Sequence, residues 1–75
     1  MAVKSKSKDS VYKVVEVIGT STKSWAEAGR NAVETAAGTL RDLRVAEVVK
    51  LDMTVENGKV SAYRARVTLS FKYGS

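Results

Sequence analysis

A run of β-branched residues constrains this chain more than any other feature of its sequence. The segment VYKVVEVI occupies residues 11–18. Successive side chains of a strand point to opposite faces, and in this segment both faces are apolar. Such a strand must be covered on both sides. A chain of 75 residues can provide one cover from a helix of its own, so we expect the second cover to come from another subunit.

The composition excludes several classes of function. The sequence contains no Cys and no His, which rules out disulfides, thiolate nucleophiles, imidazole bases and the usual zinc ligands. Its acidic residues are scattered over different predicted elements, and its Gly-Thr-Ser segment lacks the other glycines and the lysine of a phosphate-binding loop. We therefore expect a protein that is not an enzyme.

The net charge of +5 is unevenly distributed along the chain. We interpret residues 1–10, with their alternating Ser and Lys, as a flexible basic tail and residues 11–75 as the folded domain. The steady positive stripe and the exposed aromatic residues typical of nucleic-acid-binding surfaces are missing, which argues against nucleic acid as a partner of the tail. A structural shell or a nucleic-acid-binding module that uses this tail is a less favoured alternative. No apolar run is long enough to span a membrane and no secretory signal is recognisable, so we expect a cytoplasmic protein.

An amphipathic helix is predicted for residues 25–42. Ser24 and Glu27 have the spacing of a capping box at its start. Its apolar stripe consists of Trp25, Ala28, Gly29, Ala32, Val33, Ala36 and Leu40. Because most of these side chains are small, we expect the helix to lie close against a sheet. We interpret Trp25 as a core anchor at its start, and the alternative is a ligand-stacking residue.

Two long strands are predicted for residues 43–55 and 59–73. A two-residue turn between them would place each apolar face opposite the polar residues of the other strand. We therefore predict a three-residue loop with Gly58 in the left-handed conformation, so that Val45 faces Leu69. The predicted fold class is α+β with the order β-α-β-β. Its three-stranded antiparallel sheet has the last strand in the centre and wraps around one helix.

Two sets of charges are anomalous in this register. Glu47 falls on an apolar face, where it needs either a salt bridge to a neighbouring subunit or contact with a ligand or cation. Lys50 faces Arg64 and Val48 faces Arg66, so positive charge accumulates on the other face. A neighbouring carboxylate can compensate this charge. The alternative is an anion such as phosphate, for which Lys50 and Arg66 are candidate contacts.

The segments VYKVVEVIGTS, SWAEA, TLRDLRVAEVVK, ENGK and SFKY, in this order, resemble the dodecin family over roughly residues 11–73. The resemblance implies a hollow homododecamer that binds or stores small ligands without catalysis. It also implies a flavin pocket with a stacking Trp and a hydrogen-bonding Gln, at the positions of Val45 and Arg64. Neither residue reproduces the aromatic stack or the amide pairing, so we expect binding of FMN or riboflavin to be weak.

The RVAEV segment is similar to a calcium-binding subgroup of dodecins, which implies calcium as the bound ion. Calcium takes six to eight oxygen ligands, and the sequence contains no EF-hand loop. On their chemistry alone, the candidate ligands are Glu16, Asp42, Glu47 and Asp52. The alternative is sequestration of a flavin or another phosphate-bearing cofactor through Arg64 and its basic neighbours.

Overall fold

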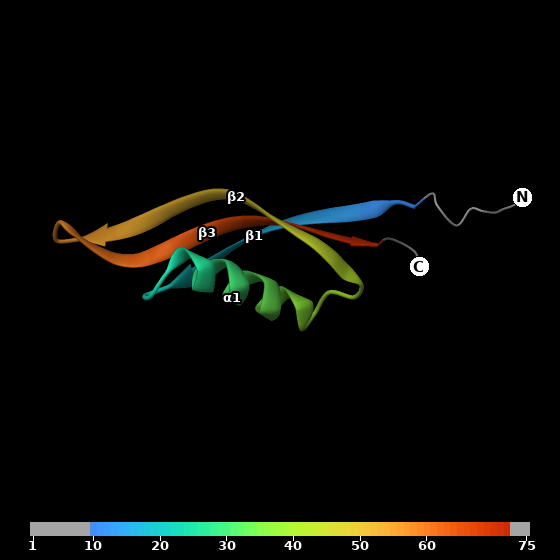
Figure 1. The fold of residues 1–75 in the computed structure, drawn as a ribbon, viewed down its shortest axis with the longest axis horizontal. Helices are drawn as coiled ribbons and strands as arrows, with labels where there is room; N and C mark the ends of the chain where they lie inside the picture. The colour runs from blue at the N-terminus through green and yellow to red at the C-terminus, as the bar shows by residue number, and fades with distance from the viewer. Residues whose placement is uncertain (1–9, 73–75) are drawn as a thin grey trace, which may run out of the picture.

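The fold is a three-stranded sheet with one helix on one face, as described for residues 10–72 by a computed structural model (Figure 1). Its elements are β1 (Tyr12–Ser21), α1 (Trp25–Ala37), β2 (Leu43–Glu56) and β3 (Lys59–Lys72). The sheet is antiparallel with the order β1-β3-β2, which confirms the predicted fold class and the central last strand. Residues 1–9 of the predicted tail and Tyr73 of the predicted last strand lie outside the described part. Within residues 10–72 no helix is long and apolar enough to cross a membrane.

The start of α1 follows the predicted capping pattern in part. Ser24 is the N-cap, and its Oγ accepts a hydrogen bond from the Glu27 amide at 3.0 Å. The Glu27 carboxylate does not complete the capping box, because it accepts instead from the Ser21 hydroxyl at 2.9 Å. Ser21 thereby ties the end of β1 to the first turn of the helix. β1 also continues to Ser21, so the predicted end of this strand at residue 18 was wrong.

The helix ends earlier than predicted. It stops at Ala37 instead of residue 42, and Gly38 caps it by donating its amide to the carbonyl oxygen of Thr35. Asp42 adopts a positive φ of 56°, which no residue of a right-handed helix can have. The apolar stripe therefore reaches Leu40 through a short turn and not through helix.

The core between α1 and the sheet is small. Among residues 10–72 the buried hydrophobic residues are Ala28, Ala32, Ala65, Val67 and Leu69. Contact is closest at Gly19 of β1, where a Cβ atom would lie 2.1 Å from the carbonyl oxygen of Ala28. The small residues of the helix and this glycine let the two backbones approach, as the sequence indicates, but they bury little apolar area.

The turn between β2 and β3 differs from the prediction. Glu56 pairs with Lys59, so the loop has only two residues, and Asn57 and Gly58 both have positive φ, 53° and 75°. These angles are typical of a type I′ turn, and the predicted three-residue loop was wrong. A two-residue turn was predicted to place apolar residues of one strand opposite polar residues of the other. A bulge in β3, with Ser61 as its extra residue, brings the apolar faces of the two strands back to the same side.

Further bulges in β2 change which residues share a face. Shifts of register occur between Val48 and Lys50 and between Leu43 and Val45. The resulting partners differ from those predicted: Val45 pairs with Ser70, Val48 with Val67, Lys50 with Arg66, and Asp52 with Arg64. Glu47 pairs with Thr68 and is exposed on the face away from α1, so it does not interrupt an apolar face.

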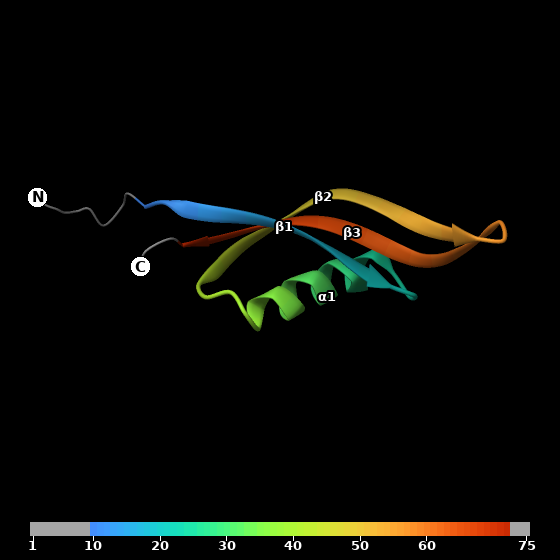
Figure 2. The same ribbon diagram turned by 180° about the vertical axis from the view of Figure 1, so that it is seen from behind.

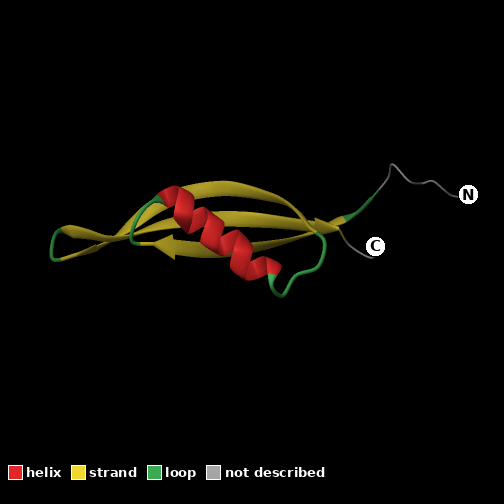
Figure 3. Ribbon diagram, turned by 60° about the horizontal axis from the view of Figure 1, so that its bottom comes forward, coloured by secondary structure: helices red, strands yellow, loops and turns green. Residues whose placement is uncertain are grey.

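The sheet extends well beyond the helix. Strands of 14 residues span about 46 Å at about 3.3 Å per residue, whereas the 13 residues of α1 span about 20 Å. Figures 1 and 2 show the turn of the β2–β3 hairpin projecting past α1, and Figure 3 shows α1 crossing the sheet obliquely. Exposed apolar residues of β2, among them Leu51 and Met53, lie along this strand. The β2–β3 hairpin therefore overhangs the helix.

Candidate functional site

The predicted site residues of β1, β2 and β3 gather on the face of the sheet that α1 leaves open. We call this the outer face, and cross-strand pairing defines its residues, because directly paired residues point to the same side. Ala65, Val67 and Leu69 of β3 pack toward α1, so Arg64, Arg66, Thr68 and Ser70 point the other way. Four rows of three residues run across the sheet in the order β1, β3, β2: Thr20-Arg64-Asp52, Ile18-Arg66-Lys50, Glu16-Thr68-Glu47 and Val14-Ser70-Val45.

The first row contains a bidentate ion pair between β2 and β3. Arg64 donates from Nε to Oδ1 of Asp52 at 2.7 Å, and from Nη2 to Oδ2 at 2.9 Å. The hydrogen bond from Arg64 lowers the pKa of the Asp52 carboxyl. Desolvation opposes this shift, and the positive charges of Arg64, Arg66 and Lys50 lower the pKa further. The same hydrogen bond raises the pKa of Arg64. Both charged groups are therefore already engaged with each other.

Trp25 joins this pair to the helix. Its Nε1 donates to the carbonyl oxygen of Asp52 at 2.9 Å, and its ring meets the edge of Tyr63 with the centroids 5.1 Å apart. Trp25 thus anchors the helix start to the β2–β3 hairpin. It is not part of the buried core, so the prediction of a core anchor was wrong. The sequence alone did not identify this contact because the residue that accepts the bond uses its backbone.

The second row places two cations opposite each other. Lys50 pairs with Arg66 across β2 and β3, so the accumulation of positive charge predicted for this face is confirmed with a different partner. Within residues 10–72 neither side chain has a carboxylate oxygen within the 4.0 Å of an ion pair. Their positive charges act on the carboxylate of Asp52, which Arg64 already holds. The row is thus suited to bind an anionic group such as a carboxylate or phosphate.

The third row places two of the predicted metal ligands on either side of Thr68. Glu16 and Glu47 are exposed, and each pairs directly with this residue. The predicted ligand Asp42 lies elsewhere, before β2, where its carboxylate is 3.6 Å from the Arg44 guanidinium. In the described part of the chain no three potential metal ligands lie together as a group. One subunit therefore does not bring the four predicted carboxylates into a single calcium site. Thr68 itself was not predicted, because its position between the two carboxylates depends on register.

The fourth row contains Val45, for which the family resemblance predicted the place of a flavin-stacking aromatic residue. Val45 is exposed beside Ser70 and shares its row with Val14. Arg64, the second residue that the resemblance predicted for a flavin pocket, lies three rows away and is bound by Asp52. These side chains offer no aromatic surface and no amide for a flavin ring.

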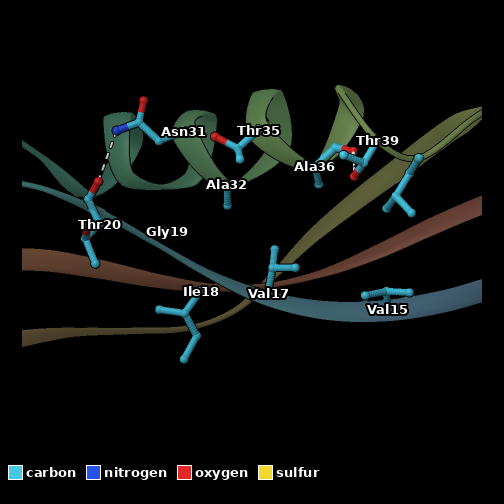
Figure 4. A pocket seen from close by; sticks show the side chains of 11 residues that line it. Val15, Val17, Ile18, Gly19, Thr20, Asn31, Ala32, Thr35, Ala36 and Thr39 are labelled. Carbon is cyan, nitrogen blue, oxygen red and sulfur yellow. Dashed lines mark hydrogen bonds between the residues drawn. The ribbon is translucent and has the colours of Figure 1, made fainter.

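An apolar groove between α1 and β1 is a second candidate site (Figure 4). It has a volume of about 470 Å³ and is lined by Val15 and Val17 of the strand and by Asn31 and Thr35 of the helix, among others. The side-chain amide of Asn31 donates to the carbonyl oxygen of Thr20 at 3.0 Å. No charged side chain lines the groove, so it is not suited to a metal ion. The sequence analysis did not identify this groove.

Known proteins are similar to this chain in sequence and in fold. Residues 11–74 match the protein family described as Dodecin. The chain is 44% identical over 63 residues to the calcium dodecin of Mycobacterium tuberculosis, a match that covers 84% of this chain and 89% of the relative.

Solved structures show the same topology. The dodecin of Streptomyces coelicolor matches with a TM-score of 0.82 and 36% identity, covering 89% of this chain and 96% of that one. A calcium-chelating calcium dodecin from Mycobacterium tuberculosis, described as having a novel calcium-binding site, matches with a TM-score of 0.75 and 47% identity. It covers 84% of this chain and 90% of that one. Family match, identity and topology agree, and the chain belongs to the dodecin family.

Proposed function

We propose that this protein is a non-catalytic, homododecameric binding protein that takes up calcium. The observation that carries this proposal is the 44% identity to a relative named calcium dodecin, over 84% of the chain. The residues support a binding role, because the chain has no His or Cys and no catalytic arrangement is recognisable among its carboxylates. Storage of the ion and a cytoplasmic location remain predictions from the sequence.

Assembly is supported by what one subunit leaves uncovered. The described part of the chain buries five hydrophobic residues, whereas twelve large hydrophobic residues remain exposed, including Ile18, Leu51 and Met53. Monomeric proteins rarely expose apolar surface on this scale. Contacts with identical subunits would cover the strands and supply the apolar burial that the small core lacks.

Calcium binding is supported by the carboxylates that the chain offers. A complete calcium site requires more of them together than one subunit provides. Calcium takes six to eight oxygens, and no group of three ligating side chains forms within residues 10–72 of one chain. We therefore expect a site built between subunits, with Glu16, Asp42, Glu47 and Asp52 as the candidate ligands. Backbone carbonyl oxygens would complete the coordination.

Isothermal titration calorimetry with CaCl₂ tests the proposal, and MgCl₂ serves as the competing hard cation. Four single variants, Glu16→Gln, Asp42→Asn, Glu47→Gln and Asp52→Asn, identify the ligands. Loss of a true ligand should weaken calcium binding about tenfold or more, with a smaller effect on assembly. Glu34→Gln on the exposed side of α1 is the control and should bind as the unaltered chain does. An unaltered chain that binds no calcium at millimolar concentration contradicts the proposal.

Flavin binding is the alternative function. It finds less support, since Val45 carries no ring and the Arg64 guanidinium is held by Asp52. Quenching of FMN fluorescence by the assembled protein measures it directly. We expect weak quenching, and submicromolar affinity for FMN would favour the flavin function over the calcium function.

A further inference from the structure

The chain contains two asparagine residues, and their surroundings differ. Asn31 lies within α1, is followed by Ala32, and donates its side-chain amide to the carbonyl oxygen of Thr20 at 3.0 Å. Asn57 lies in the turn between β2 and β3, is exposed, and is followed by Gly58. In the described part of the chain the side-chain amide of Asn57 makes no hydrogen bond.

The backbone nitrogen of Gly58 is accessible beside this amide. Glu56 and Lys59 form the pair that closes the turn, so the two residues between them lie outside the ladder of the hairpin. Within residues 10–72 the Gly58 amide donates to no backbone oxygen. No atom lies within 4 Å of the position that a Cβ of Gly58 would occupy, so this side of the residue is open. The turn also projects past α1 (Figures 1 and 2).

This arrangement brings together the two groups of a cyclisation reaction. The Gly58 nitrogen, deprotonated by hydroxide, can attack Cγ of Asn57, and glycine has no side chain that would block the approach. The N–Cγ bond forms, the Cγ–Nδ2 bond breaks, and Nδ2 leaves as ammonia with the hydrogen that the Gly58 nitrogen lost. Water then opens the five-membered imide. The sequence of steps involves no oxidation or reduction, and water is its only other reactant.

We propose that Asn57 is a site of spontaneous deamidation at the tip of the hairpin. Opening of the imide at Cγ gives aspartate, and opening at the backbone carbonyl gives isoaspartate, in which the main chain runs through Cβ and Cγ. The inference depends neither on calcium binding nor on self-assembly.

The two products should affect the turn differently. Aspartate tolerates the positive φ of this position, and Asp-Gly is itself typical of a type I′ turn. Isoaspartate lengthens the main chain by a methylene group, although the pairing of Glu56 with Lys59 leaves room for only two ordinary residues. We therefore expect isoaspartate to disrupt the turn and aspartate to preserve it.

Mass spectrometry of tryptic peptides tests the reaction. Trypsin cuts after Lys and Arg, so residues 51–59 and residues 31–41 form separate peptides with one asparagine each. After days at pH 8 and 37 °C the folded protein should yield a 51–59 peptide that is heavier by about 1 Da and resolves into two products on chromatography. The 31–41 peptide is the internal control and should keep its mass. A digest at time zero corrects for deamidation during handling.

Two variants separate the chemistry from the structure. In urea, where the turn plays no part, Gly58→Ala should slow the mass gain about tenfold or more because its methyl group hinders the attack. Asn57→Asp supplies one product without ageing and should unfold at the same urea concentration as the fresh, unaltered chain. The isoaspartate fraction of the aged protein should unfold at a lower concentration.

The rate in the folded protein decides the inference. A gain in the 51–59 peptide within about tenfold of the rate in urea supports it, because the folded turn then leaves Asn57 open to attack. A gain in urea without one in the folded protein over the same time overturns it, since the folded state then protects Asn57. Equal gains in the two peptides of the folded protein also overturn it, because the turn would then confer no selectivity.

Discussion

Gly19 marks the place where the strand and helix backbones are closest. A Cβ atom added there would lie 2.1 Å from the carbonyl oxygen of Ala28 and 2.8 Å from the Cβ of Ala32. Gly19→Ala should therefore force α1 away from β1 and lower the free energy of unfolding by about 1–3 kcal/mol or more. Urea unfolding followed by circular dichroism measures the loss.

Gly29→Ala is the matched control for this substitution. Its added Cβ would be 4.0 Å from the Cβ of Ala65, an ordinary contact, and alanine favours the helix. We expect a neutral effect or a gain of up to about 1 kcal/mol. Equal losses in the two variants would show that the close approach at Gly19 does not limit packing.

The Asp52–Arg64 pair makes stability depend on pH in the acidic range. Because the pKa of Asp52 is lowered by the hydrogen bond from Arg64, the folded chain binds fewer protons at this group than the unfolded chain. The stabilisation is present above the ordinary pKa of 3.8 and is lost as the pH falls through the lower value in the folded state.

Asp52→Asn tests this dependence. The difference in unfolding free energy between the unaltered chain and this variant should be largest at neutral pH and should vanish progressively below pH 4. Glu34→Gln, at a carboxylate that makes no ion pair in the described part of the chain, should show no such trend. A difference that stays constant down to pH 2.5 would mean that the pair does not stabilise the folded subunit.

At the scale of the elements, the hairpin turn depends on one glycine. Gly58 has a φ of 75°, and no atom lies within 4 Å of the position of its missing Cβ, so only backbone conformation opposes a side chain there. Gly58→Ala should lower the unfolding free energy by about 1 kcal/mol. Asn57→Gly, at a φ of 53°, should change it by a few tenths of a kcal/mol because either residue tolerates this region. Chemical denaturation measures the unfolding free energy of both variants. A Gly58→Ala variant as stable as the unaltered chain would argue against the two-residue turn.

The elements could be predicted from the sequence because each carries its own local signals. Alternating apolar residues identified the strands, and Ser24 with Glu27 identified the helix start. The turn and the register could not be predicted in the same way. The argument against a two-residue turn assumed that every residue of one strand pairs with one residue of the other. In the structure Ser61 is an extra residue of β3, and its hydroxyl is hydrogen-bonded to that of Thr54 at 2.6 Å. A bulge is a property of two paired strands, so neither strand alone indicates it.

The candidate site was predictable only as a set of residue types. Glu16, Glu47, Lys50 and Arg66 stood out by charge, but their arrangement as two rows follows from the bulge at Val49, which moves Glu47 to the outer face. The sequence therefore gives the composition of this face without its geometry.

For the whole molecule, assembly and stability should be inseparable. With five buried hydrophobic residues in its described part, a lone subunit has little to stabilise it. Light scattering should give a mass near twelve subunits of 8.1 kDa, and the midpoint of thermal unfolding should rise with protein concentration. A folded monomer at micromolar concentration, or a midpoint independent of concentration, would contradict this prediction.

The sheet order also determines when the strands can pair during synthesis. β1 pairs with β3 and not with its neighbour in sequence, so Tyr12 meets Lys72 across nearly the whole described chain. β2 and β3 are joined by a two-residue turn and can form their hairpin locally. β1 can pair only after β3, the last strand, has left the ribosome. Until then β1 has no strand to pair with. The strand that most constrains the fold is thus the last to be protected, and nascent chains should be most prone to aggregate before β3 emerges.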